Sequence, residues 1–202
     1  MSSTSRLDRL RTESAIKRPN KLKLMKTKSM LVSAILVLAA VVSLRAAEAP
    51  KMEPTKPTSA EFEKMKSMVG SWKGKTDMGQ GPVDMTLTYR LVAGGTVLEE
   101  RVFAGTPNEM LTMYYEKNGK LALTHYCMLG NRPGMVLKSS DGNTLKFDFD
   151  ENCGVNAEKE THMHSLTIKF EDADTVTSTC KALVEGKEMP DHPCTLKRIK
   201  AS

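Results

Sequence analysis

The chain has 202 residues, of which 27% are charged and 40% are hydrophobic, and its formal net charge is +6. Ten of the 30 Lys and Arg residues lie in positions 1–46, together with only two of the 24 Asp and Glu residues. The rest of the chain therefore holds 20 basic and 22 acidic residues. This balance excludes the basic surface that nucleic-acid binding requires.

The N-terminal region has the pattern of a secretory signal peptide. Residues 31–44 form an uncharged apolar run of 14 residues, shorter than the roughly 20 needed to span a bilayer as a helix. Two lysines precede this run and small residues follow it. We expect residues 1–49 to be a basic leader and signal peptide whose true start is Met25. The protein would then be exported, to the periplasm or out of the cell, with no stable membrane span after cleavage. An uncleaved anchor is the alternative.

A short helix is expected to open the folded domain. Residues 50–57 contain prolines and no apolar pattern, which predicts a linker, so the domain covers residues 58–202. Thr58 and Glu61 have the spacing of a capping box. Apolar residues follow at helical spacing, which predicts a helix over about residues 58–68 that ends before Gly70.

Beyond Gly70 the apolar period changes to two, which predicts β-strands. The predicted strands cover about residues 70–77, 83–91, 96–103, 110–116, 120–128, 135–139, 145–150, 162–170, 175–184 and 194–200. No second strong helical pattern follows. The predicted fold is all-β, an antiparallel up-and-down barrel of ten strands with the short N-terminal helix closing one end.

The loops between these strands alternate in length. Every second connection is tight and carries Gly, Asn or Asp, at residues 93–95, 118–119, 141–143 and 172–174. Alternate turns of a meander lie at the same end of the barrel. One end is therefore tight and the other is built from longer loops. Because the first strand starts at the tight end, the helix and Trp72 are expected to close it, above an interior that is either filled or holds a ligand.

The first and last strands resemble those of the calycin superfamily, which includes lipocalins, fatty-acid-binding proteins and nitrobindins. The resemblance rests on Gly70, Trp72 and Gly74 in the first strand and on Arg198 in the last. Thr76 replaces the third glycine of the nitrobindin motif. The resemblance implies that Arg198 lies over the Trp72 ring. Residues 104–110 and 123–133 also resemble a set of exported bacterial proteins of unknown function, over about residues 60–200, and this likeness supplies no activity.

Three histidines are candidates for the loop-rich end. His162 and His164 share a strand face with the apolar Leu166, and His125 lies on the apolar face of its own strand, so all three are expected to point inward. One interpretation is a haem or divalent metal site, because imidazole binds Zn, Cu and Fe, and nitrobindins bind haem through a histidine. The other interpretation, which we favour, is that they are polar residues at the wet rim of a cavity.

Further candidates come from other apolar faces and from the loops. Tyr89 and Met113 fall on apolar strand faces, and Arg132 lies in a loop of the open end, where it could meet a carboxylate. The charged run of Glu99, Glu100 and Arg101 stands in mid-strand, where alternation forces at least one of the three to face solvent. The others could place an ion pair inside the barrel. The candidate ligand-binding set is therefore His125, His162, His164, Tyr89, Met113 and Arg132.

An exported chain with four cysteines favours disulfides. Cys180 and Cys194 are symmetric about Lys187, so a hairpin centred there predicts that they pair. Cys127 and Cys153 both fall near the open end, and we expect the second pair there. The alternative is a free, nucleophilic Cys127 two residues from His125.

The sequence thus favours an exported binding protein, not an enzyme, that holds a small hydrophobic or amphipathic ligand inside a barrel. No cofactor is part of this prediction. The alternatives are a haem- or metal-binding barrel that uses the inward histidines, and a structural envelope protein with a filled interior.

Overall fold

The computed structural model describes residues 56–57, 59–77 and 81–200. The expectations for the leader, the signal peptide, the start at Met25 and most of the linker lie outside these residues. Within them, no helix has both the length and the apolar character that crossing a membrane requires.

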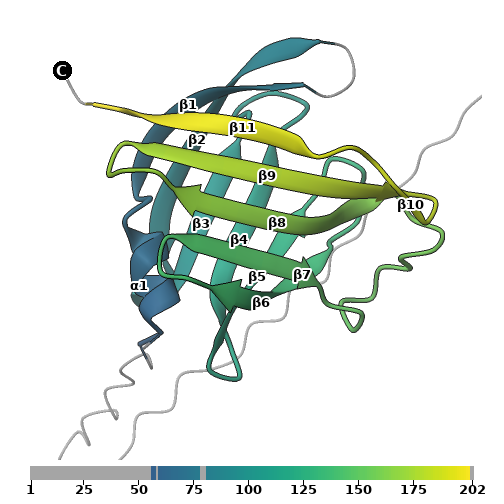
Figure 1. Ribbon diagram of the computed structural model, residues 1–202, viewed down its shortest axis with the longest axis horizontal. Helices are drawn as coiled ribbons and strands as arrows, with labels where there is room; N and C mark the ends of the chain where they lie inside the picture. Colours follow the sequence, from purple (N-terminus) through teal and green to yellow (C-terminus); the bar gives the residue numbers. More distant parts are fainter. Residues whose placement is uncertain (1–55, 58, 78–80, 201–202) are drawn as a thin grey trace, which may run out of the picture. The chain divides into compact units, whose positions relative to one another are not determined.

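The described residues form one α-helix and eleven strands, drawn in Figure 1. Their bounds are α1 Ala60–Lys66, β1 Gly70–Asp77, β2 Pro82–Val92, β3 Val97–Val102, β4 Met110–Lys117, β5 Lys120–Tyr126, β6 Gly134–Ser140, β7 Thr144–Phe149, β8 His162–Phe170, β9 Thr175–Val184, β10 Lys187–Glu188 and β11 His192–Ile199. A single 3-10 turn, Ala93–Gly95, joins β2 to β3.

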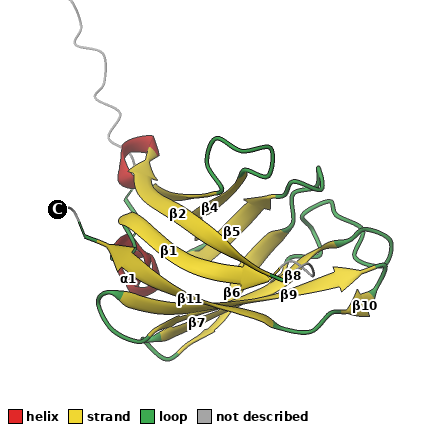
Figure 2. Ribbon diagram, turned by 90° about the horizontal axis from the view of Figure 1, so that it is seen from above, coloured by secondary structure: helices red, strands yellow, loops and turns green. Residues whose placement is uncertain are grey.

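Ten of the described strands close into an antiparallel barrel. Each of β1 to β9 pairs with its neighbour in the chain, β9 also pairs with β11, and β11 returns to β1. The two-residue β10 only extends the end of β9. Figure 2 shows the strands curling around a common interior with α1 at one end. The predicted ten-stranded up-and-down barrel is confirmed, and it is consistent with a calycin-like fold.

Helix α1 is shorter than predicted and is capped differently. Its N-cap is Ser59, whose Oγ accepts a hydrogen bond from the Phe62 amide at 3.2 Å. The Ser59 amide in turn donates to Glu116 Oε1 in β4 at 2.6 Å. A carboxylate from the barrel thus takes the place that the capping-box prediction gave to Glu61. This contact joins the helix to the tight-turn end, where Lys64 Nζ also donates to Asn143 Oδ1 at 3.3 Å.

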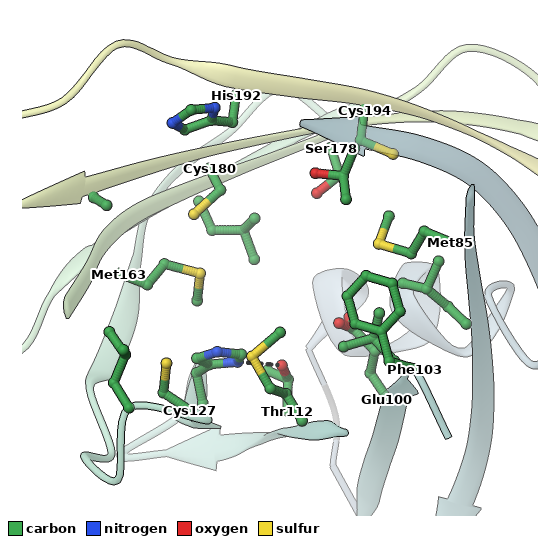
Figure 3. A pocket seen from close by; sticks show the side chains of 18 of the residues that line it. Met85, Glu100, Phe103, Thr112, Cys127, Met163, Ser178, Cys180, His192 and Cys194 are labelled. Carbon is green, nitrogen blue, oxygen red and sulfur yellow. Dashed lines mark hydrogen bonds between the residues drawn. The ribbon is translucent and has the colours of Figure 1, made fainter. Parts of the chain in front are cut away.

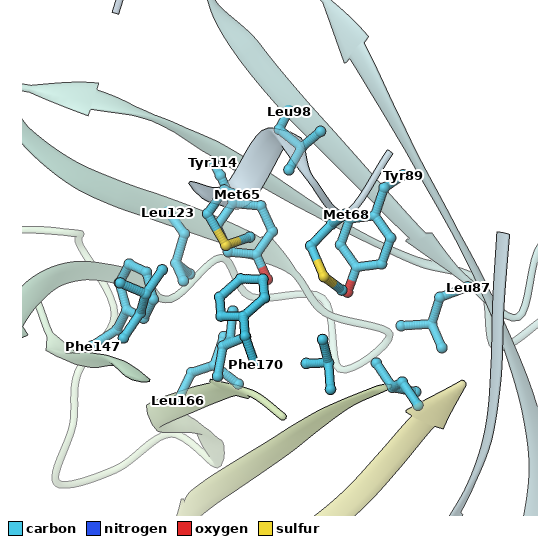
Figure 4. Packing of buried hydrophobic residues seen from close by; sticks show 14 of the residues in the cluster. Met65, Met68, Leu87, Tyr89, Leu98, Tyr114, Leu123, Phe147, Leu166 and Phe170 are labelled. Carbon is cyan, nitrogen blue, oxygen red and sulfur yellow. The ribbon is translucent and has the colours of Figure 1, made fainter. Parts of the chain in front are cut away.

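The helix and Trp72 form the floor of the barrel, as predicted. Phe62, Met65 and Met68 are buried, and the Trp72 indole N–H donates to the Met68 carbonyl at 2.7 Å. In Figure 4, Met65 and Met68 lie beside the rings of Tyr89 and Tyr114. Burying such side chains stabilises the fold by about 1.5–3 kcal/mol each, so the floor is a substantial part of the core.

Two positions of the first strand require glycine because atoms of β11 lie too close for a side chain. Gly70 has φ +125°, and a Cβ there would lie 3.1 Å from Arg198 Nη1. At Gly74 a Cβ would lie 2.7 Å from the Thr195 carbonyl oxygen on β11. Only glycine leaves room for β11 to close the barrel against β1. The spacing of Gly70 and Gly74 around Trp72 therefore follows from barrel closure.

Candidate functional site: the barrel cavity

A cavity of about 480 Å³ occupies the barrel between the floor and the loop-rich end. Its lining is largely apolar and includes Leu87, Val102, Met110, Met163 and Leu166. Figure 3 shows Met163, Cys180 and Cys127 pointing into it from opposite walls. This volume lies within the range of small-molecule sites, roughly 300–1,000 Å³.

The mouth of the cavity is apolar and exposed. Leu129, Val184 and Met189 all line the cavity, and they keep 59%, 37% and 39% of their surface exposed. These side chains come from the loop after β5, the end of β9 and the loop before β11. Exposed apolar side chains that converge at an opening are typical of a binding site for an apolar molecule.

The deep part of the cavity contains a polar cluster around Glu100. The Tyr114 hydroxyl donates to Glu100 Oε2 at 2.8 Å, and Tyr89 and Thr112 stand opposite Glu100 on the two neighbouring strands, where their hydroxyls favour the charged carboxylate. Burial raises the pKa of Glu100, while the three hydroxyls oppose this rise. Burial also raises the pKa of Tyr89 and of Tyr114 well above the usual value, and the Glu100 charge adds to both shifts. Both phenols therefore stay neutral donors.

Alternation along β3 separates the three charged residues found in the sequence. Glu100 lies opposite Tyr89 and Thr112 and faces the cavity. Glu99 faces the other way and pairs with Arg90 at 2.7 Å and with Arg101 at 3.6 Å. Arg101, on the same outer face, is partly exposed, as alternation predicted for at least one of the three, while Glu99 is covered by its arginine partners. The ion pairs lie outside the barrel. Glu100 was absent from the candidate set, although Leu98 and Val102 at two residues on either side marked its face as inward.

His125 lines the cavity, as the sequence predicted. Its Nδ1 lies 3.0 Å from Thr112 Oγ1, and its side chain is almost fully buried. Burial lowers the pKa of His125 to about 4. The imidazole is therefore neutral at physiological pH, and its partner Thr112 stands opposite Glu100 in the strand register.

The prediction that His162 and His164 face inward beside Leu166 is wrong. A β-bulge between Met163 and Ser165 shifts the register of β8 against β9. Met163 and Leu166 consequently line the cavity, and neither histidine does.

The two displaced histidines form a ring cluster of their own. His162 Nε2 lies 3.1 Å from His164 Nδ1, and both rings pack on Phe149, with ring centres at 4.7 and 5.2 Å. The three histidines therefore do not converge. Within the described part of the chain, no group of three His, Cys, Asp or Glu side chains is placed to hold a metal ion. His192, which was not among the candidates, does line the cavity.

The remaining candidates divide between the cavity and other surfaces. Tyr89 lines the cavity. Met113 lies opposite Glu99 in the register of β3 and β4, so it belongs to the outer face. Arg132 lines a separate groove of about 330 Å³ beside β5 and β6, together with Lys117 and Asp150.

Each of the four cysteines, all in the described residues, is a free thiol, so neither predicted disulfide is present. The hairpin between β9 and β11 is not centred on Lys187: Cys180 lies opposite His192, and Cys194 lies opposite Ser178. Cys127 lines the cavity, whereas Cys153 lines the separate groove. The expected partners therefore lie in different places.

Cys180 and Cys194 also line the cavity, and burial raises the pKa of both thiols, that of Cys180 to about 12. Neither is a reactive thiolate at neutral pH. The cavity is thus an apolar, sulfur-rich space with one carboxyl group deep inside it. Comparison of this chain with known protein families and with curated protein sequences finds no match.

Proposed function

We propose that this chain is an exported binding protein that holds a small, largely apolar molecule inside its barrel. The observation that carries the proposal is the cavity of about 480 Å³ above a sealed floor, with an apolar mouth. A structural protein with a filled barrel would have no such space. Export is supported by the signal-like pattern of residues 31–44.

A binding role accounts for the lining better than catalysis does. His125 is neutral and bonded to Thr112, and Cys180 is a protonated thiol at neutral pH, so neither is an activated nucleophile or a charged acid. The haem or metal alternative has less support, since only His125 of its three histidines lines the cavity. A Soret band after reconstitution with haem would support the haem-binding alternative.

A neutral fluorescent probe, N-phenyl-1-naphthylamine, tests the proposal. We expect saturable one-to-one binding with enhanced emission. Ser178 lines the cavity and its neighbour Thr179 does not, so Ser178→Phe and Thr179→Phe are a matched pair on one strand. Ser178→Phe should weaken probe binding by about tenfold or more, because the ring occupies the cavity, while Thr179→Phe should not. Thermal melting establishes that both variants fold.

Two results would overturn the proposal. One is the absence of saturable binding to the wild-type protein. The other is equal weakening by Ser178→Phe and Thr179→Phe, because the probe would then occupy a surface unrelated to the cavity. Native mass spectrometry of the freshly purified protein gives an independent readout, in which the expected result is a co-purified small molecule.

A further inference from the structure

The deep end of the cavity holds an acidic side chain and no basic one among the described residues. Among the described residues that line the whole cavity there is no Lys or Arg. Its acidic residues are Asp77, at the end of β1, and Glu100, which lies at the base beside Tyr89 and Tyr114. No ion pair to Glu100 exists within the described residues, whereas the neighbouring Glu99 is paired with two arginines on the outer face. Within the described residues, the Glu99 carboxylate on the outer face therefore has cationic partners, and the Glu100 carboxylate inside the barrel has none.

The partners of Glu100 are neutral hydroxyls. Tyr114 from β4 donates a hydrogen bond to it, and Tyr89 from β2 and Thr112 from β4 stand opposite it in the strand register. Such hydroxyls hold the carboxyl in one place and favour its charged form against the effect of burial, but they supply no opposite charge. A carboxylate enclosed by the walls of an apolar cavity without a cation lowers the stability of the empty protein. An arrangement of this kind is expected where a ligand supplies the missing charge.

The same arrangement discriminates between amphiphiles. A ligand with a carboxylate head would bring a second negative charge next to Glu100 in an apolar space and would be repelled. An alcohol head would gain hydrogen bonds only. An ammonium head would gain both hydrogen bonds and charge pairing, while its apolar part fills the space lined by Leu87, Met110, Met163 and Leu166.

We propose that the ligand of this barrel is an amphiphile with a positively charged amine, and that Glu100 is the residue that binds the amine. This inference rests on the proposed function, because it names the class of molecule that the same cavity holds. The apolar mouth admits the chain of the ligand, and the base of the cavity selects its head group.

The test uses three compounds that share a twelve-carbon chain and differ in the head group: dodecylamine, dodecan-1-ol and dodecanoate. Each displaces N-phenyl-1-naphthylamine from the purified protein at pH 7.5, below its micelle concentration. We expect the amine to displace the probe at a concentration about tenfold or more below that of the alcohol, and the acid to be the weakest. Glu100→Gln should bring the amine to the affinity of the alcohol.

Glu99→Gln is the matched control, since it removes one negative charge from the adjacent position on the opposite face of β3. It should keep the preference for the amine, which excludes a general attraction of cations to the protein. Thermal unfolding gives a second readout. Without ligand, Glu100→Gln should melt at a higher temperature than the wild type at pH 7.5, and saturating dodecylamine should raise the wild-type melting temperature more than that of the variant.

The possible failures are distinguishable. If the probe and the alcohol bind but the amine shows no preference, or if its preference survives in Glu100→Gln, the head-group inference is overturned and the binding function stands. If neither the probe nor any of the three compounds binds to the wild type, the proposed function itself is overturned, and the inference falls with it.

Discussion

The Arg198 guanidinium lies 4.2 Å from the centre of the Trp72 ring and joins the last strand of the barrel to the first. Its Nη1 donates to the Val69 carbonyl at 2.8 Å, and its Nη2 donates to the Ser67 carbonyl at 2.5 Å. These two carbonyls belong to the turn between α1 and β1. The Arg198 side chain thus covers Trp72 in the floor of the barrel and donates hydrogen bonds to the carbonyls of the turn that positions the helix.

Arg198→Ala is expected to destabilise the protein by about 2–4 kcal/mol, because it removes a cation–π contact and charged hydrogen bonds together. Arg198→Lys should recover only part of this loss, because an ammonium group does not reproduce the fork of donors. Urea unfolding measures both changes. The exposed neighbour Lys197 is the control, and Lys197→Ala should stay within about 0.5 kcal/mol of the wild type. A similar loss in both alanine variants would contradict this role of Arg198.

Gly74→Ala is expected to weaken barrel closure. The added methyl group would lie 2.7 Å from the Thr195 carbonyl, so β1 and β11 must separate. We expect a loss of about 1–3 kcal/mol in the free energy of unfolding and faster hydrogen exchange in the amides that join these two strands. Lys73→Ala, an exposed position on the same strand, serves as the reference. Unchanged exchange in Gly74→Ala would show that the strands are not in close contact.

The folded protein is expected to lose stability in acid because of His125. Burial lowers its pKa to about 4 in the folded protein, below the usual 6.5 of the unfolded chain. The unfolded state therefore binds a proton first as the pH falls, and the folded state loses relative stability between about pH 6.5 and pH 4. Between pH 7 and pH 5 this amounts to about 2 kcal/mol.

His125→Gln provides the comparison, because glutamine retains a partner for Thr112 and does not titrate. The wild type should lose about 2 kcal/mol more than the variant between pH 7 and pH 5 in urea unfolding. The other titrating groups are common to both proteins and cancel in the difference. Parallel stability curves for the two proteins would mean that His125 is solvated.

The cysteines report cavity occupancy. Cys127 lines the cavity and Cys153 lines the separate groove, so a bound probe should protect the first thiol from alkylation and leave the second unchanged. Cys180 should react slowest without ligand at pH 8, by about tenfold or more relative to Cys153, because its pKa of about 12 leaves little thiolate. Differential alkylation followed by peptide mass spectrometry measures all four sites, and recovery of a disulfide-linked peptide pair would contradict the free thiols.

Several site residues were misplaced by sequence reasoning for one common reason. Alternation assigns a strand residue to a face only while the register is regular, and a single extra residue reverses every assignment beyond it. The bulge at His164 moved His162 and His164 off the cavity wall and brought Met163 onto it. The turn between β9 and β11 likewise shifted Cys194 from Cys180 to Ser178.

Local patterns succeeded where one short-range rule decides the outcome. The ten strands and the tight turns follow from residue types at short spacing, and all are present. The contact of Arg198 with Trp72 joins residues far apart in the chain; it was implied only by the resemblance of the first and last strands to those of calycins, and it too is present. The inward direction of Glu100 was also available from Leu98 and Val102 on the same face of one regular strand. The charge environment of Glu100 could not be predicted in this way, because the absence of a cation beside it depends on side chains from β2, β4, β5 and β9.

The sequence by itself determined the class of fold, the order of the strands and the end of the barrel that the helix and Trp72 close. Alternation, turn residues and glycine requirements act within a few positions of the chain, so they can be recognised without the tertiary structure. Only the tertiary structure decided which polar groups share the cavity. That outcome depends on bulges and on register across strands far apart in sequence, where a shift of one residue exchanges the inside of the barrel for its outside.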